Sequence, residues 1–438
     1  MSANSETPGA RQQRLAAYLD SLAEAAGHVD RAVPLKSYCT GLLLPGERKS
    51  VEPMAARLAP DNVRRMHQSL HHVVAEAPWS DEALLGRVRN YVLPIMEKRG
   101  PIVVWIVDDT GNPKKGTHSV GVARQYCGQT GKKENCQVAV SLSVANWSSS
   151  LPVAWRLYLP ETWANAKERR AKARIPKEIV FQTKLEISLE QIRQAIADGV
   201  PQGTVLADPA YGNDTAFRAA LAELGLQYVV GIQSTTTVWP PGMQPLPVPK
   251  YSGRGQPPRR LRRDEKHTPV AAKQLALSLP AKAWKTVTWR EGTRTALRSR
   301  FAAVRVRAAH RDYKQGQPRA KEWLLIEWPR GDAEPSKYWL SNLDKAVPLR
   351  DLVALGKQRW IIERDYQELK QELGLGHFEG RGWRGFHHHA TLSIAAYGFL
   401  VAERSRFSPS ARAGHLELPI PALPENFQPR GSHSSGAA

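Results

Sequence analysis

The stretch that decides the fold is PIVVWIVDDTGNPKKG, residues 101–116. It begins with an unbroken apolar run, which is typical of a strand buried on both faces. The run ends on Asp108 and Asp109, and a turn rich in glycine, proline and lysine follows. Because successive strand residues point to opposite faces, only one of these two acids can point toward a given site.

More strand and helix signals follow along the chain. Three strand candidates come next, HSVGVARQYCG (118–128), ENCQVAVSLSVA (134–145) and LPVAWRLYLP (151–160). Strands and helices then alternate, as KLEISLEQIRQAIADG (184–199, helix), GTVLADPAYG (203–212, strand), NDTAFRAALAELG (213–225, helix) and QYVVGIQ (227–233, strand). Consecutive strands followed by this alternation predict an α/β fold, in which a mixed sheet is flanked by helices.

The rest of the chain divides around this core. Residues 1–99 have apolar residues near helical spacing and are predicted to form a helical N-terminal DNA-binding domain. The core occupies 100–235 and returns at 346–406 with helices that carry a glutamate. Between them, 236–345 is predicted to be a mostly β insertion, because its apolar residues alternate. The tail, 407–438, is rich in proline, serine and glycine and is predicted to be disordered.

Charge is the most informative property of the composition. The 62 lysines and arginines outnumber the 41 acids, which gives a net charge of +21. Such an excess favours a polyanionic partner, above all nucleic acid, although a basic soluble enzyme is the alternative. The sequence has no apolar run of membrane-spanning length and no secretion signal at its start, so we expect a cytoplasmic protein with free thiols at Cys39, Cys127 and Cys136.

A second acid follows a second buried strand. Asp208 comes directly after the apolar residues of GTVLADPAYG, as Asp108 and Asp109 do after theirs. Carboxylates at neighbouring strand ends can converge, and oxygen ligands of this kind suit Mg²⁺. Two such ions about 4 Å apart clamp the oxygens of an in-line phosphoryl displacement. Each motif taken alone is equally compatible with a turn or a helix cap.

The third candidate acid lies on a helix, RWIIERDYQELK, residues 359–370. At about 100° per residue, Arg359, Glu363 and Lys370 fall on one face, and Tyr366 lies at its edge. A carboxylate between two cations suits contact with a DNA backbone beside a metal site. The alternative is a solvated helix with ordinary salt bridges.

This helix resembles the Y-R-E-K signature of bacterial insertion-sequence DDE transposases, which has the spacing Y-x2-R-x3-E-x6-K. Arg359, Glu363 and Lys370 fit that spacing. The tyrosine position falls on Gly356, where this chain departs from the signature, and Tyr366 is a partial replacement for it. Further similarity to one branch of these transposases lies in GLLLPGERKSVEPMAARL (41–58), in the segment that begins DDTGNPKKG, and in IPKEIVFQTK (175–184).

The resemblance implies a ribonuclease H-like core and assigns roles to the acids. The first acid of such proteins directly precedes a threonine, which corresponds to Asp109, and the second corresponds to Asp208. With Glu363 they would hold two Mg²⁺ ions, for which Mn²⁺ substitutes. The implied activity is cleavage at inverted-repeat ends and transfer of the 3′-OH into target DNA. The implied partner is double-stranded DNA, bound by a homodimer in the bacterial cytoplasm at the nucleoid.

Residues for DNA contact come from the resemblance and from residue type. The resemblance assigns this role to Arg359 and Lys370, with Tyr366 beside them. Basic loop residues are further candidates, and a solvated loop is the alternative for each; they are Lys114, Lys115, Arg259, Arg260, Arg262 and Arg263. Two other functions compete with a transposase. One is a non-catalytic, transposase-derived DNA-binding regulator, and the other is a metal-dependent nuclease without strand transfer.

Overall fold

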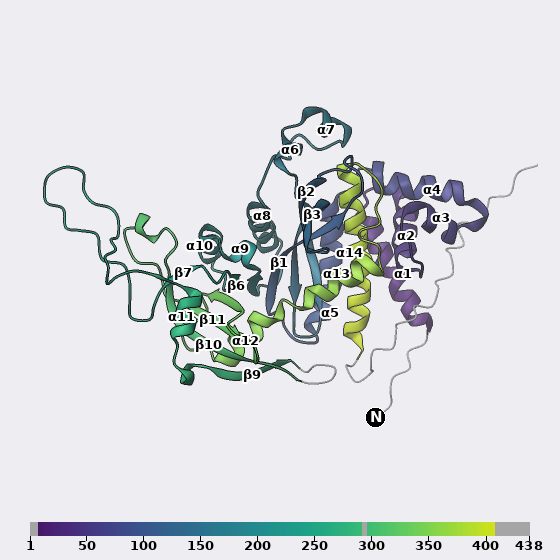
Figure 1. Cartoon of the computed structure of the whole chain (residues 1–438). Helices are drawn as coiled ribbons and strands as arrows, with labels where there is room; N and C mark the ends of the chain where they lie inside the picture. The colour runs from purple at the N-terminus through teal and green to yellow at the C-terminus, as the bar shows by residue number, and fades with distance from the viewer. Residues whose placement is uncertain (1–7, 291–295, 408–438) are drawn as a thin grey trace, which may run out of the picture. The chain divides into compact units, whose positions relative to one another are not determined.

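The structure, a computed structural model of the chain, describes residues 8–290 and 296–407. The chain forms two compact units. Leu93–Tyr366 makes up one unit, and the segments before and after it make up the other. Figure 1 shows the elements of both. The predicted disordered tail lies almost entirely outside the described residues.

The unit built from both ends of the chain is helical. Its elements are α1 (Pro8–Glu24), α2 (Val29–Leu43), α3 (Val51–Leu58), η1 (Pro60–Asn62), α4 (Val63–His71), η2 (His72–Glu76), most of α5 (Asp81–Glu97), the end of α13 (Ile361–Gln371) and α14 (Trp383–Arg406). Helix α14 is buried along most of its length and packs against α2 and η2. Contacts that fix helix α1 to it include two hydrogen bonds: the Tyr18 hydroxyl donates to the Ala395 carbonyl at 2.8 Å, and Arg14 Nε donates to the buried Glu403 carboxylate at 2.8 Å.

The other unit contains one large mixed sheet. Its strands are β1 (Val104–Pro113), β2 (Ala123–Cys127), β3 (Lys132–Ala145), β4 (Ser150–Leu157), β5 (Thr204–Ala207), β6 (Tyr228–Ile232), β7 (Thr237–Trp239), β8 (Val270–Ala271), β9 (Lys285–Arg290), β10 (Leu297–Ala308), β11 (Glu322–Trp328) and β12 (Lys337–Ser341). They follow the order β2-β3-β1-β5-β6-β12-β11-β10-β7-β8, with β4 paired to β3 and β9 paired to β10. Strands β1, β5 and β6 are parallel, and the other pairings are antiparallel. The predicted α/β class with a mixed sheet is confirmed.

Helices lie on both faces of this sheet (Figure 1). The helices of this unit are α6 (Glu161–Ala164), α7 (Lys167–Lys172), α8 (Lys184–Ala197), α9 (Pro209–Gly212), α10 (Thr215–Glu223), α11 (Ala272–Ser278), η3 (Ala281–Ala283), η4 (Asp312–Lys314), α12 (Leu349–Gln358) and the first part of α13. Helix α8 packs on β3 and β4, and α12 packs on β5, β6, β9 and β10. Helix α8 begins with a capping box in which the Thr183 and Glu186 side chains each accept from the other's backbone N–H, so its start is well defined.

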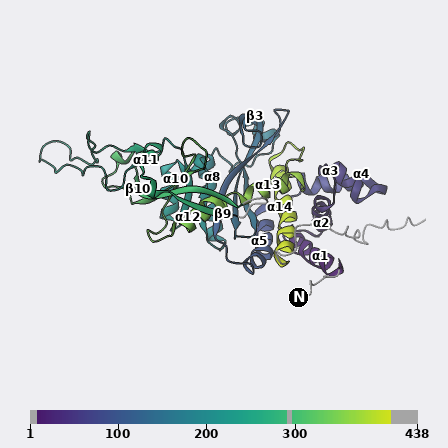
Figure 2. The ribbon, with the colours of Figure 1, turned by 60° about the horizontal axis from the view of Figure 1, so that its bottom comes forward.

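The segment predicted to be an insertion continues the same sheet. Strand β12 pairs with β6 of the core, and β11, β10, β7 and β8 follow outward from it. Between β7 and β8 the chain runs as a long loop that projects from the sheet, apart from one isolated bridge between Leu246 and Arg262 (Figure 2). The predicted arginine run, Arg259 to Arg263, lies in this loop.

A hydrophobic cluster identifies the face of the sheet that α12 and α13 cover. Ile106 of β1 and Leu206 of β5 belong to this cluster with Val353 of α12 and Ile362 of α13. All four side chains are at most 1% exposed. The even-numbered residues of β1 therefore point to this face and the odd-numbered residues to the other. This alternation sets the directions of Asp108 and Asp109.

Candidate active site

Asp108 points toward the face that α13 covers. It lies directly opposite Ser141 where β1 pairs with β3, and residues opposite one another in a sheet share a face. The Ser141 hydroxyl is hydrogen-bonded to the Tyr366 hydroxyl of α13 at 2.5 Å. The Tyr366 ring also meets the ring of Trp155, whose position in β4 is opposite Ser141. Asp108 is thus placed beneath α13 by a row of residues across three strands.

Asp208 points to the same face as Asp108. Ile106 and Leu206 are paired in the parallel ladder of β1 and β5, and Asp108 and Asp208 lie two residues farther along the two strands. Since side chains repeat every second residue, both carboxylates point to the α13 face. Asp208 also begins α9, where its Oδ1 accepts the N–H of Ala210 at 2.9 Å. The geometry therefore brings together two acids that are 100 residues apart in the sequence.

The proximity of these groups affects the pKa values of Asp108 and Arg359. The Asp108 residue is only 9% exposed, and this burial raises the pKa of its carboxyl to about 6. The Arg359 guanidinium opposes the rise in pKa, and the nearby charge of Asp208 adds to it. Arg359 donates from Nη2 to Asp108 Oδ1 at 2.8 Å. Burial lowers the pKa of Arg359, but the charges of Asp108 and Asp208 outweigh that effect, so its pKa is raised.

Asp109 points to the opposite face, which α8 covers. It lies opposite Val140 of β3. Its Oδ2 accepts a hydrogen bond from Lys184 Nζ, at the start of α8, at 2.9 Å. The Tyr211 hydroxyl of α9 lies 3.4 Å from the same oxygen. Burial raises the pKa of Tyr211, and the charge of Asp109 raises it further. The hydroxyl therefore stays protonated and donates a hydrogen bond to Asp109.

Glu363 lies on the helix over the Asp108 face but is not part of the contacts found there. It occupies the first turn of α13, with an exposed side chain. Lys370 lies in the last turn of the same helix. Within the described residues, no group of three or more His, Cys, Asp or Glu side chains has the geometry to hold a metal ion. The structure thus brings Asp108, Asp208 and Arg359 together and leaves Glu363 outside that cluster.

Gly356 explains the departure from the Y-R-E-K spacing. It is buried in α12, and a Cβ at this position would lie 3.3 Å from Leu325 Cδ2 and 3.5 Å from Val229 Cγ1. The position therefore faces the packed core, where a tyrosine ring has no room. Tyr366, the predicted substitute, has its hydroxyl hydrogen-bonded to Ser141 inside the protein. Burial raises the pKa of that hydroxyl well above its ordinary value.

The predicted basic contacts in loops have different surroundings. Lys115 is exposed, whereas Lys114 is partly buried and its backbone N–H donates to the Asn135 carbonyl at 2.9 Å. The four predicted loop arginines are all exposed. Arg263 differs from the other three, because it forms an ion pair with the buried carboxylate of Asp312.

Sequence reasoning did not find Ser141, Lys184 or Tyr211 as neighbours of the acids. Lys184 and Tyr211 both lie within recognised segments, IPKEIVFQTK and LADPAYG, but nothing in those segments says which acid they contact. Ser141 is one polar residue in an apolar strand. Because β3 is buried on both faces around Ser141, alternation of apolar and polar residues does not single it out.

Comparison with known proteins gives the family. Residues 21–296, well over half of the chain, match the DDE superfamily endonucleases. The chain belongs to this family. The match includes Asp108, Asp109 and Asp208 and ends before Glu363. It confirms the predicted kinship with DDE enzymes.

A curated relative is more specific. The chain is similar to a protein of Microchaete diplosiphon described as a probable transposase for insertion sequence element IS701. The two are 32% identical over 189 residues, which cover 43% of this chain and 45% of the relative. The chain thus matches about half the length of that relative. Separately, no helix in the described residues is long and apolar enough to cross a membrane.

Proposed function

We propose that the protein is a transposase that cuts DNA at the inverted-repeat ends of an insertion sequence and joins the freed 3′-OH to target DNA. The observation that carries the proposal is the position of Asp108, inside β1, and of Asp208, directly after the neighbouring parallel strand β5; the register points both side chains to one face of the sheet. Helix α13, which bears Glu363, covers that face. Membership of the DDE endonucleases and similarity to a probable transposase support the same function.

The arrangement of the core supports a ribonuclease H-like fold. Antiparallel strands β2, β3 and β1 continue into parallel β5 and β6, and helices pack on both faces. Ligands of open α/β sheets bind outside the carboxyl ends of parallel strands. Asp208 follows the carboxyl end of β5, and Asp108 lies beside it at the matching height of β1.

The residues fit a divalent cation of the Mg²⁺ type. Asp108 and Asp208 offer carboxylate oxygens, the hard donors that Mg²⁺ prefers, and Mn²⁺ accepts the same donors. Arg359 donates to Oδ1 of Asp108, so we propose Oδ2 as the oxygen that binds the cation. We propose Glu363 as the third ligand, because it is the acid in the first turn of the helix over these two. A cation bound there would supply positive charge beside the scissile phosphate.

Of the two adjacent acids, we propose Asp108 as the ligand. The sequence motif predicts Asp109 for this role, and that prediction rests on the following threonine alone. Asp108 shares its face with Asp208 and α13, whereas Asp109 faces α8. On this assignment Asp109 is a positioning residue, since its bond from Tyr211 fixes α9, the helix that Asp208 begins.

The surrounding cations have complementary roles in this proposal. Arg359 compensates the buried charge of Asp108 in the DNA-free protein, because an unpaired carboxylate there would be costly. Lys370 and the exposed loop residues Lys115, Arg259 and Arg260 are proposed to contact DNA phosphates. Two element ends must be paired for transposition, so we propose at least a dimer in the DNA complex.

The test uses purified protein, Mg²⁺ or Mn²⁺, and a DNA fragment with the inverted repeats that flank the gene. An Asp208→Ala variant is the matched control. Metal-dependent cleavage with joined products supports a transposase, and cleavage without joining indicates a nuclease. Binding without any metal-dependent cutting overturns the enzymatic proposal and favours a DNA-binding regulator.

A further inference from the structure

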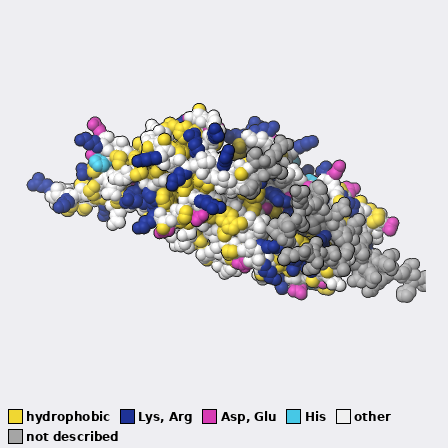
Figure 3. Space-filling view, turned by 90° about the horizontal axis from the view of Figure 1, so that it is seen from below, with side chains coloured by type: hydrophobic (Ala, Val, Ile, Leu, Met, Phe, Trp, Pro, Cys, Tyr) yellow, Lys and Arg dark blue, Asp and Glu magenta, His cyan; other side chains and the backbone are white. Residues whose placement is uncertain are grey.

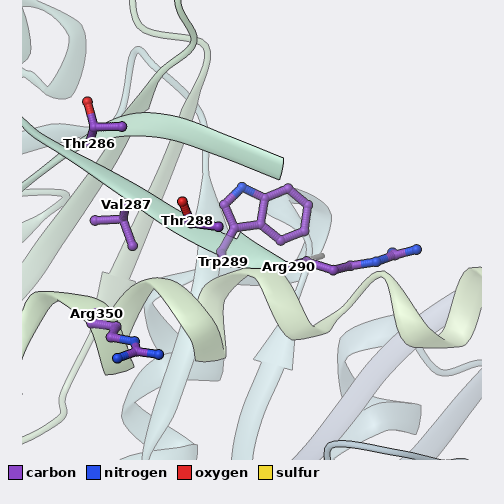
Figure 4. Close-up of a pocket in the computed structure, with 6 residues that line it drawn as sticks. All are labelled: Thr286, Val287, Thr288, Trp289, Arg290 and Arg350. Atoms are coloured by element: carbon purple, nitrogen blue, oxygen red, sulfur yellow. The ribbon is translucent and has the colours of Figure 1, made fainter. Parts of the chain in front are cut away.

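An open pocket of about 520 Å³ lies between strand β9 and helix α12 (Figure 4). Its lining consists of Thr286, Val287, Thr288, Trp289, Arg290 and Arg350. Within the described residues β9 pairs only with β10, so its other edge carries backbone groups without a neighbouring strand. The pocket is thus a groove along a free strand edge, and we call it the β9 groove.

Polar and cationic groups dominate the exposed part of the β9 groove. The side chains of Thr286, Thr288, Arg290 and Arg350 are exposed. Among the described residues, neither arginine forms an ion pair with a carboxylate. The basic surface continues onto β10, where the exposed Arg298 lies opposite Thr288. Figure 3, which views the molecule from below, shows many lysine and arginine side chains and few acidic ones on the face where β9 lies.

The apolar residues of β9 are partly buried. Val287 and Trp289 pack against the hydrophobic cluster beneath α12. This packing holds β9 firmly against the core of the unit. Trp289 lines the groove but is partly buried by this packing, so the exposed side chains of the lining are threonines and arginines.

The β9 groove is connected to the proposed active site through one contact. The Arg290 guanidinium lies over the Trp360 ring, 3.6 Å from its centroid. Trp360 directly follows Arg359, which holds Asp108, and directly precedes α13, which bears Glu363. A ligand that engages Arg290 therefore lies next to the segment that carries two residues of the site.

We propose that the β9 groove binds the phosphate backbone of duplex DNA. Phosphates are bound in proteins by arginine side chains, threonine hydroxyls and backbone N–H groups, and the groove offers all three. The proposal rests on the proposed function, because it makes DNA the polyanion that the groove holds beside the acids. It adds a contact surface distinct from the loops that the sequence indicated.

The test compares how duplex binding depends on salt in four proteins. The double variant Arg290→Ala/Arg350→Ala removes two charges from the groove. The control Lys177→Ala/Arg193→Ala removes two charges from exposed positions outside the groove, one in the segment before α8 and one on α8. The third variant, Arg290→Lys/Arg350→Lys, keeps the groove's charge. The wild-type protein is the reference, and thermal unfolding shows that each variant is folded.

Each lost phosphate contact lowers the slope of log K against log salt by about 0.9. We expect the groove double variant to lose about 1.8 from the slope and at least about tenfold in affinity at low salt. The α8 control and the lysine variant are expected to keep the wild-type slope. A folded groove variant with an unchanged slope overturns the proposal. The proposal is also overturned if the groove variant loses affinity for an RNA duplex but not for a DNA duplex of the same length.

Failure of this proposal is distinguishable from failure of the proposed function. If the wild-type protein cleaves DNA and the groove variant has an unchanged salt slope, the β9 groove proposal is wrong and the transposase proposal stands. If the groove variant has a reduced salt slope and the wild-type protein does not cleave DNA, the β9 groove proposal stands and the enzymatic proposal is wrong.

Discussion

Adjacent residues of one strand have different neighbours because a strand alternates its side chains. Asp108 has Ser141 and Arg359 on its face, and Asp109 has Lys184 and Tyr211 on the other. Their sequence environment is nearly identical, whereas their structural environment is not. A comparison of the two acids therefore tests the proposed site at the scale of one residue.

We expect Asp108→Asn to reduce metal-dependent cleavage to background, because the amide removes an anionic ligand beside Asp208. Asp109→Asn is expected to lower cleavage only by about 10- to 100-fold, the usual cost of losing a residue that orients a ligand. Rates measured on one DNA fragment with an end repeat compare the two variants. The reverse order of activities would instead support the threonine motif, which assigns the role to Asp109.

Gly356 allows a prediction about stability. Gly356→Tyr is expected to lower the free energy of unfolding by about 3 kcal/mol or more, because the ring would be forced against Leu325 and Val229. Gly356→Ala is the control: its single Cβ fits after a small shift, and alanine favours the helix by about 1 kcal/mol. Urea unfolding measures both variants. A Gly356→Tyr protein as stable as the wild type would show that this position does not face the core.

Part of the site could be predicted from single residues and part could not. Asp208 follows a short apolar strand, so an acid at a strand end could be predicted from the sequence. The choice between Asp108 and Asp109 depends on the register of β1 against β3 and β5, which no local pattern specifies. The partner Lys184 lies 75 residues from Asp109, and its contact depends on where α8 packs.

At the scale of elements, α14 is a helix whose polar residues are buried with specific partners. His388 stacks on Trp79 with ring centroids 3.6 Å apart, and its Nε2 donates to the Trp79 carbonyl at 3.1 Å. The pKa of His388 is lowered to about 3, chiefly by burial, and the charges of Arg384 and His387 contribute to this lowering. Asp81 lies 3.8 Å away, and burial raises the pKa of its carboxyl to about 7, so that it carries little negative charge near His388 below that pH.

The depressed pKa of His388 predicts a specific loss of stability in acid. The unfolded chain binds a proton at this histidine below about pH 6.5 and the folded chain does not, so stability is present above that pH and is lost as pH falls toward 3. His388→Gln removes the pH-dependent contribution of His388 to stability and leaves the contribution of Asp81. We expect the stability of His388→Gln relative to wild type to rise by about 2 kcal/mol between pH 8 and pH 5.

Urea unfolding at each pH measures this difference. His72→Gln, at an exposed position of the same unit, is the control and is expected to show a constant difference from the wild type. A stability difference between His388→Gln and wild type that does not change with pH would contradict the assignment. The loss of stacking on Trp79 lowers the stability of the variant at every pH, so only the dependence on pH is diagnostic.

Most helices and strands could be predicted because their sequence patterns are local, but the pairing of the strands could not. The apolar run before Asp208 became β5, and the periodic segment 184–199 gave α8. The run before Asp108 became β1, but this strand continues through both acids to Pro113, where a turn was expected, because these residues pair with β3. The pairing of β12 with β6 joins segments more than 100 residues apart and makes the β-rich segment part of the core sheet. Strand alternation predicts that such strands exist, but not which strand lies beside which.

At the scale of the whole molecule, the two ends of the chain build one unit around α14 and the middle builds the sheet. No periodicity relates α1 to α14, because their contacts, such as Arg14 with Glu403, join residues 389 positions apart. Net charge, in contrast, is a sum over residues and is fully known from the sequence. Predictions about DNA binding by the intact protein can therefore rest on charge, whereas predictions about cleavage rest on the fold.

This difference predicts that DNA binding and DNA cleavage respond to different conditions. With a net charge of +21, binding is expected to be dominated by phosphate contacts. Six to ten such contacts would weaken binding by about 10³- to 10⁵-fold between about 50 and 200 mM salt. Removal of divalent metal with EDTA is expected to abolish cleavage and leave binding within about twofold of its original strength, since arginine and lysine hold the backbone without metal.

The Asp208→Ala variant separates the two activities in the same way. It removes one carboxylate from the proposed metal site and no cation from the surface, so its salt slope should equal that of the wild type while its cleavage falls to background. Fluorescence anisotropy with a labelled end fragment gives the slope, and gel analysis of the same fragment gives cleavage. Loss of binding in EDTA, or in Asp208→Ala, would mean that metal held by the acids anchors the DNA itself, and the basic surface would then not be the principal source of affinity.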